Sequence, residues 1–227
     1  MLSLRQVFAL RQVDLILASQ SPRRREILDM MGLTNLYQTI PSPLDETALQ
    51  TELIAQGVTK DPQKYTQTLA QEKARALAET LTTTVQRPTL ILGSDTIVDQ
   101  DEAILEKPQN AMDAMRMLQQ LSGREHYVHT GVALYLVRPG GGEPRLVASF
   151  VEQATVLFTT LTHADIQAYV NSGEPMDKAG AYGIQGMGGQ FVRSVQGDFF
   201  TVSRVRRDCR SLGHLFIPSE MHSQLAS

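Results

Sequence analysis

The side chains best suited to chemistry lie in residues 89–108, where polar groups follow a short apolar run. The run at residues 90–92 is too short for a helix and predicts a buried strand. Gly93 would end its side-chain packing, and residues 97–98 resume the strand pattern. Asp95 and its two hydroxyl neighbours then lie where the strand emerges into a cleft. A carboxylate held at such a place can bind a hard cation or take a proton from water. A strand capped by an ordinary Asp turn explains the same residues, and on this stretch alone that alternative stays open.

A second candidate is an anion site at the start of a predicted helix. Residues 14–19 predict a buried strand, after which Ser21 is a suitable N-cap and Pro22 a suitable first helical residue. The arginines at positions 23–25 would lie in the first helical turn, where cations oppose the helix dipole. Exposed backbone N–H groups together with arginine side chains can bind phosphate. The alternative is a solvated basic turn without a ligand.

Other charged candidates come from separate parts of the chain. Glu46 ends a short acidic loop, and Lys107 closes the hairpin that follows Asp95. Lys73 lies on a predicted helix, where an ordinary surface ion pair is the alternative to a ligand contact. These residues would supply one acid and two cations to a cleft if the fold brings them together.

A glycine-rich segment at residues 173–189 contains Gln185 and matches neither the dinucleotide-binding nor the Walker pattern. Its glycines would let the backbone approach a ligand closely. Two long strands are predicted at residues 125–137 and 145–158. His126 and His129 alternate with apolar residues in the first of these strands, so we expect them on its exposed face, without metal-ligand partners.

The composition limits the class of protein. The chain has 227 residues, a net charge of −3 and 42% hydrophobic residues, which suits a globular domain. No linker divides the predicted strands and helices, so we expect one α/β unit with two lobes around a central cleft. The negative charge argues against a dedicated nucleic-acid-binding module, and no apolar run is long enough for a membrane span. The single cysteine, Cys209, fits a reducing compartment, so we expect a cytoplasmic protein. Residues 1–13 are interpreted as an N-terminal extension and not as a secretory signal.

Several motifs together resemble the Maf family of nucleoside triphosphate pyrophosphatases, over residues 14–202. In chain order they read LASQSPRRREIL, QEKARA, GSDTIV, LEKP, LSGREH and GEPMDKAGAYGIQG. The resemblance implies an elongated mixed sheet flanked by helices, of the Maf/ITPase-like kind, with the active site in a cleft. It also implies hydrolysis of a nucleoside triphosphate between the α and β phosphates, which yields a nucleoside monophosphate and pyrophosphate.

The resemblance assigns roles to particular residues. Asp95 falls on the position of the proton acceptor, and Arg23, Thr96 and Gln185 fall on positions linked to base choice. They resemble the subgroup that acts on dTTP and UTP, with CTP or modified nucleotides as further candidates. We expect three catalytic residues, Asp95, Glu46 and Lys107. We expect six substrate-binding residues, Ser21, Arg23, Arg24, Lys73, Thr96 and Gln185. Asp95 and Glu46 are the expected ligands of Mg²⁺ or Mn²⁺.

The end of the chain departs from the family pattern. Residues 203–227 lack the closing apolar helix and have no helical periodicity, so we interpret them as a divergent C-terminal tail after a pyrophosphatase domain at residues 14–202. This departure motivates an alternative function, a nucleotide-binding regulatory protein with impaired catalysis. A nucleoside triphosphate is the expected partner, in a homodimer without nucleic acid or membrane.

Overall fold

The computed structural model describes residues 12–101 and 103–197. Within these ranges seven strands form one mixed sheet in the order β2-β1-β3-β5-β6-β7, with β4 pairing with β3. β1 is parallel to β2 and to β3, whereas the remaining pairs are antiparallel. The strands are β1 Asp14–Leu17, β2 Tyr37–Thr39, β3 Thr89–Gln100, β4 Ala103–Leu105, β5 Glu125–Val137, β6 Arg145–Phe158 and β7 Val192–Gln196.

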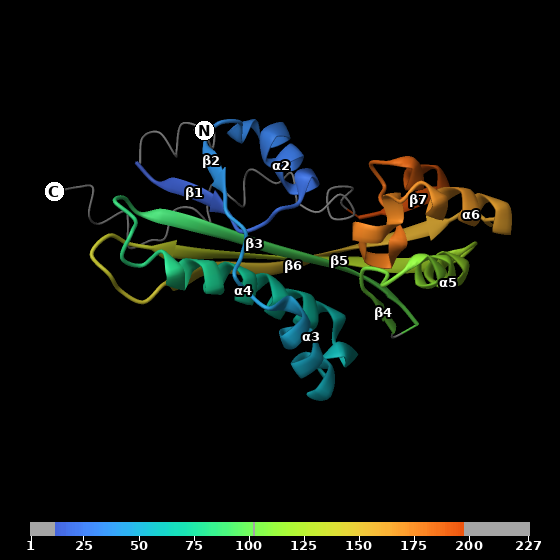
Figure 1. Cartoon of the computed structure of the whole chain (residues 1–227), viewed down its shortest axis with the longest axis horizontal. Helices are drawn as coiled ribbons and strands as arrows, with labels where there is room; N and C mark the ends of the chain where they lie inside the picture. The colour runs from blue at the N-terminus through green and yellow to red at the C-terminus, as the bar shows by residue number, and fades with distance from the viewer. Residues whose placement is uncertain (1–11, 102, 198–227) are drawn as a thin grey trace.

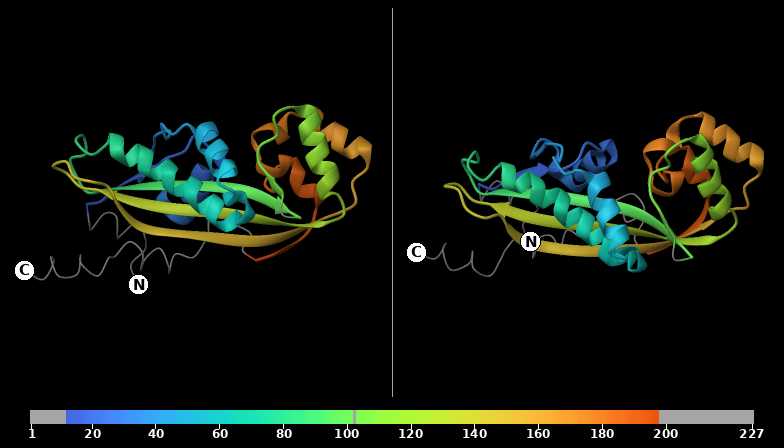
Figure 2. Two further views of the ribbon diagram at one scale, coloured as in Figure 1. Left: turned by 90° about the horizontal axis from the view of Figure 1, so that it is seen from below. Right: turned by 60° about the horizontal axis from the view of Figure 1, so that its bottom comes forward.

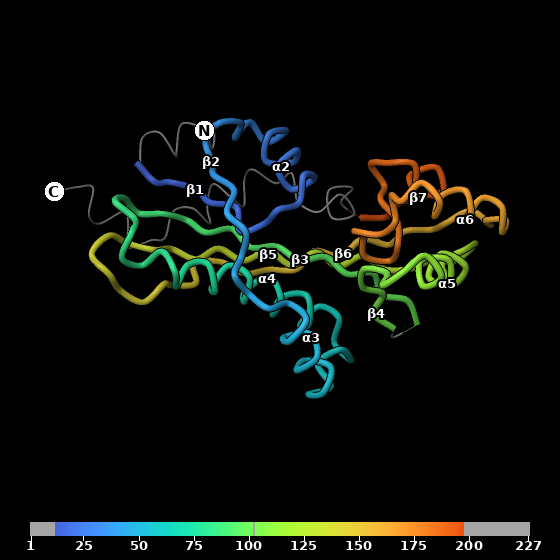
Figure 3. The backbone as a smooth tube through the Cα atoms, in the orientation of Figure 1, coloured from blue at the N-terminus to red at the C-terminus, as the bar shows by residue number. Residues whose placement is uncertain are grey.

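The helices are α2 Pro22–Leu28, α3 Glu46–Ala55, α4 Pro62–Thr80, α5 Ala111–Leu121 and α6 His163–Asn171, with short helical turns between them. The long strands β3, β5 and β6 run along the molecule, and helices gather around its two halves (Figure 1). Figure 3 shows α5 and α6 set apart from α3 and α4 along these strands. This arrangement confirms the predicted α/β fold, an elongated mixed sheet flanked by helices.

Separate apolar clusters fill the two halves. One cluster contains Leu118 of α5, Ile166 of α6 and Phe158 of β6. Others pack Leu17 of β1 and Ala74 of α4 against the opposite half of the sheet. We call the half with α2, α3 and α4 the first lobe, and the half with α5 and α6 the second lobe. Figure 2 shows the second lobe standing beside α3 and α4, as the two-lobe prediction requires.

The prediction that side-chain packing ends at Gly93 is wrong, because β3 continues to Gln100 and residues 94–98 are buried. A Cβ atom on Gly93 would lie 2.4 Å from the carbonyl oxygen of Ala70 and 2.8 Å from Cβ of Ala74. Glycine within a strand often marks such a close backbone approach. Gly93 therefore lets α4 pack directly on the sheet, and Asp95 lies within the strand and not beyond its end.

The prediction that His126 and His129 lie on an exposed strand face is also wrong. Their exposed fractions are 1% and 3%. His126 packs edge-on against Phe158 and Tyr182, side chains of the second lobe, which covers this part of β5. Burial lowers the pKa of His126 to about 4, so the ring is neutral near pH 7.

Capping side chains stand at the starts of three helices. Asp61 and Asn110 cap α4 and α5, and Thr162 with Asp165 forms a capping box on α6. No helix in the described part of the chain has the length and apolarity needed to cross a bilayer. Residues 1–11 of the predicted extension and the tail at residues 203–227 lie outside the described residues.

Candidate active site

A cavity of about 620 Å³ opens where the two lobes meet, lined by the β1–α2 connection, α3, α4, β3 and the residues after β4. It contains most of the residues expected from the sequence to act on a ligand. These are Ser21, Arg24, Glu46, Lys73, Asp95, Thr96 and Lys107. The fold therefore brings together side chains from five separate segments of the chain.

Lys73 lies at the centre of the charged groups. Its Nζ atom is 2.5 Å from Oδ1 of Asp95 and 2.8 Å from Oε2 of Glu46. The Lys73 side chain is only 5% exposed, which rules out the surface ion pair considered from the sequence. Lys73 reaches the cavity because α4 packs closely on β3, and the hydroxyl of Ser42 donates to its backbone carbonyl.

Asp95 has one oxygen paired and one available. Its Oδ1 atom accepts from Lys73, whereas Oδ2 is buried and has no hydrogen-bond partner in the described residues. A buried carboxylate oxygen without a partner is costly unless a ligand or water satisfies it. The free oxygen of Asp95 is thus suited to a water molecule or a cation.

Arg24 is the buried member of the arginine run. Its Nη1 atom donates to the hydroxyl of Ser19 at 2.9 Å, and burial lowers the pKa of the guanidinium, against the opposing charges of Asp95 and Glu46. Ser21 occupies the N-cap position of α2, although its side chain makes no capping bond. Arg24 therefore points its charge into the cavity and away from bulk water.

Glu106 is a cavity residue that the sequence did not single out as functional. The hydroxyl of Tyr65 donates to its Oε1 atom at 2.9 Å. Burial and the charge of Asp95 raise the pKa of Glu106 to about 7. The only sequence signal was its place beside Lys107 in the LEKP motif, and its neighbour Tyr65 comes from a helix that is distant along the chain.

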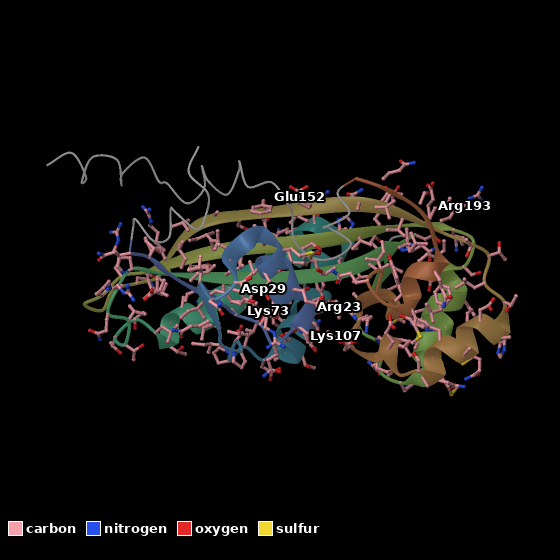
Figure 4. The ribbon with its side chains drawn as sticks, turned by 90° about the horizontal axis from the view of Figure 1, so that it is seen from above. Arg23, Asp29, Lys73, Lys107, Glu152 and Arg193 are labelled. Atoms are coloured by element: carbon pink, nitrogen blue, oxygen red, sulfur yellow. The ribbon has the colours of Figure 1, made fainter. Side chains whose placement is uncertain are left out.

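A second, smaller cavity adjoins the first and contains the remaining predicted residues. Arg23 and Gln185 line it, and Thr96 lines both cavities. The Thr96 hydroxyl pairs with that of Thr130 at 2.9 Å. Arg23 also lies 4.0 Å from Asp177, an acid of the second lobe. Figure 4 shows Arg23, Lys73 and Lys107 near the junction of the lobes.

The open mixed α/β sheet therefore gathers cations and carboxylates from separate segments around one cavity. Residues 14–203 match the family described as "Maf-like protein", and the chain belongs to that family. The family assignment agrees with the resemblance that the sequence motifs indicated.

Curated relatives carry a more specific name. A protein of Geobacillus sp. (strain WCH70), named dTTP/UTP pyrophosphatase, is 40% identical over 88% of this chain and 98% of its own. One of Bacillus cereus (strain AH820), with the same name, is 42% identical over 83% and 87%. A Homo sapiens protein, "Probable bifunctional dTTP/UTP pyrophosphatase/methyltransferase protein", is 41% identical over 89% of this chain and 32% of its own. The solved Staphylococcus aureus Ham1 protein is only distantly similar, at 12% identity and a TM-score of 0.32.

Proposed function

We propose that this protein hydrolyses nucleoside triphosphates to a nucleoside monophosphate and pyrophosphate, with dTTP and UTP as preferred substrates. The observation that carries the proposal is the 620 Å³ cavity in which Asp95 lies with three cations, Arg24, Lys73 and Lys107. The names of the bacterial relatives, which cover most of both chains, support the same reaction. The volume of the cavity can hold a triphosphate, and its three cations can pair with phosphate oxygens.

The cations would stabilise the triphosphate. Arg24 can form a two-pronged contact to phosphate oxygens, while Lys73 and Lys107 act as point charges. Because Arg24 and Lys73 are buried and paired before substrate binds, they need little rearrangement when charge develops on the leaving pyrophosphate. Electrostatic stabilisation and positioning supply most of the catalysis in phosphoryl transfer.

Asp95 would act as the base. Its Oδ2 atom has no partner among the described residues and can accept a hydrogen bond from a water molecule, while Lys73 fixes Oδ1. The water oxygen forms a bond to the α phosphorus, and the bond from that phosphorus to the oxygen bridging to the β phosphorus breaks. Asp95 takes the proton of the water, and pyrophosphate leaves with the electron pair.

The site also fits a divalent cation. The unpaired Oδ2 atom of Asp95 and the nearby carboxylate of Glu46 are hard oxygen ligands, the kind that Mg²⁺ or Mn²⁺ prefers. No group of three or more His, Cys, Asp or Glu suited to a metal ion occurs in residues 12–101 and 103–197. Two carboxylates are enough for Mg²⁺, which usually completes its shell with water and substrate phosphates. Bound there, the cation would neutralise triphosphate charge.

Base choice would depend on the second cavity. Thr96 and Gln185 can donate to and accept from a pyrimidine edge, and a purine would leave such groups mispaired. We therefore propose dTTP and UTP ahead of ATP and GTP, with CTP or modified nucleotides as weaker candidates.

Pyrophosphate release from UTP, dTTP, CTP, ATP and GTP, with and without Mg²⁺, tests the proposal. We expect release from the pyrimidine nucleotides first and a requirement for the metal. Release of inorganic phosphate alone, or none from any nucleotide, would contradict it. The homodimer, the absence of a nucleic-acid partner and the cytoplasmic location stay predictions.

A further inference from the structure

Two side chains of the second lobe, Glu174 and Tyr169, form hydrogen bonds with the backbone of the segment that carries Gln185. The Glu174 Oε1 atom accepts from the Tyr169 hydroxyl at 3.0 Å and from the backbone N–H of Gly188 at 3.4 Å. Its Oε2 atom accepts from the backbone N–H of Met187 at 2.9 Å. Glu174 thus fixes the backbone directly after Gln185.

Tyr169 fixes the backbone on the other side of Gln185. Its hydroxyl accepts from the backbone N–H of Gly183 at 3.3 Å. Burial and the hydrogen bond to Glu174 raise the pKa of Tyr169, so the hydroxyl keeps its proton and donates to the carboxylate. Residues 183–188 are therefore attached at both ends to one Tyr–Glu pair.

The glycines of the segment fit this pair closely. A Cβ atom on Gly186 would lie 2.2 Å from Oε1 of Glu174, and one on Gly188 would lie 2.6 Å from the hydroxyl oxygen of Tyr169. A side chain at either position would require the segment, or the Glu174 or Tyr169 side chain, to move. The backbone therefore wraps directly on Glu174 and Tyr169, while the Gln185 side chain lines the second cavity.

We propose that Glu174 and Tyr169 are positioning residues that set nucleobase selectivity, by holding residues 183–188 so that Gln185 meets the base. Neither side chain lines the two cavities, so both act through the segment and not by touching the nucleotide. This inference rests on the proposed function, since it assumes that Gln185 reads the base.

The substitution Glu174→Gln tests the role of the carboxylate. The Glu174 carboxylate accepts from three donors, so an amide of the same shape places its NH₂ group against a donor in either orientation. If the segment is correctly placed in only a fraction of the molecules, the apparent affinity for the nucleotide is reduced in proportion to that fraction. We expect KM for UTP to rise about tenfold or more, with kcat within about threefold of the unmodified protein.

The ratio between substrates separates positioning from a general loss of stability. We expect kcat/KM for GTP to change less than about threefold, so that the UTP preference falls about tenfold. Tyr169→Phe should shift the ratio in the same direction by a smaller factor. The control is Glu79→Gln, an exposed acid of α4 outside both cavities, which should leave the ratio unchanged.

Two results would overturn the inference. One is an unchanged UTP-to-GTP ratio in Glu174→Gln, and the other is an equal loss on both nucleotides with a lower Tm, which would indicate a purely structural role. Calorimetric titration with UTP and with GTP gives the ratio of their Kd values, a measure of selectivity that does not use kcat/KM. An unmodified protein that binds UTP selectively but releases no pyrophosphate would refute the proposed function alone. One that binds neither nucleotide would refute both.

Discussion

Lys73 forms ion pairs with Asp95 and Glu46 at similar distances. The structure predicts that the coupling free energies of these two ion pairs differ greatly. Oδ1 of Asp95 lies 2.5 Å and Oε2 of Glu46 lies 2.8 Å from its Nζ atom. The side chains of Lys73 and Asp95 are 5% and 9% exposed, whereas that of Glu46 is 42% exposed. Water therefore screens the contact with Glu46 but hardly reaches the contact with Asp95.

The expected magnitudes follow from this burial. With an effective dielectric constant of about 20, charges 2.5 Å apart attract by roughly 6–7 kcal/mol. The cost of removing each ion from water cancels in a double-mutant cycle, but relaxation around the charge left in each single variant lowers the measured coupling below that attraction. We expect a coupling free energy of about 2–4 kcal/mol between Lys73 and Asp95, and less than about 1 kcal/mol between Lys73 and Glu46.

Double-mutant cycles measure both couplings. They use Lys73→Met, Asp95→Asn, Glu46→Gln and the two double variants that contain Lys73→Met. The chain has no tryptophan, so urea unfolding is followed by circular dichroism. Lys73→Met alone should lower the free energy of unfolding by about 3–5 kcal/mol. A coupling to Glu46 as large as that to Asp95 would refute the argument from burial.

Three further substitutions test separate parts of the account. Arg23→Ala should lower kcat/KM for UTP about tenfold and change Tm by less than about 3 °C, because the ion pair of Arg23 with Asp177 is 4.0 Å long and partly exposed. A large fall in Tm with normal kinetics would indicate a structural role. Gln185→Ala should reduce the UTP-to-GTP preference about tenfold, and an unchanged preference would contradict its assignment to the base. The pKa of His126 is about 4 in the folded protein and ordinarily 6.5. As the pH drops from 6.5 to 4, His126 is therefore protonated in the unfolded chain but not in the folded protein, and the free energy of unfolding falls. His126→Gln should gain up to about 3 kcal/mol over the unmodified protein across that range in urea unfolding, and parallel pH curves would contradict this.

The sequence predicted the features that depend on residues close together in the chain, such as helix starts and long strands. Helix starts at Asp61, Asn110 and Thr162 were readable because a capping side chain acts within three residues of itself. The two long strands at residues 125–137 and 145–158 were also readable, since each is a continuous apolar or alternating run.

The sequence failed where packing between distant segments decides the outcome. Side-chain packing was predicted to end at Gly93, because the contact of Gly93 with Ala70 of α4 cannot be inferred from neighbouring residues. His126 looked exposed because the second lobe that covers it comes from later residues. Glu106 was passed over as functional because its partner Tyr65 is 41 residues away. The motifs named most cavity residues in advance, but only the fold shows that Lys73 joins Asp95 to Glu46.

The most direct test of the central claim is the turnover of Asp95→Asn. Asparagine keeps the shape of the side chain but cannot accept the proton of the attacking water. We predict that kcat for pyrophosphate release from UTP falls about 10²–10⁴-fold, while the Kd for UTP stays within about threefold of the unmodified protein. A kcat close to that of the unmodified protein, in a folded variant that binds UTP normally, would contradict the assignment of Asp95 as the base.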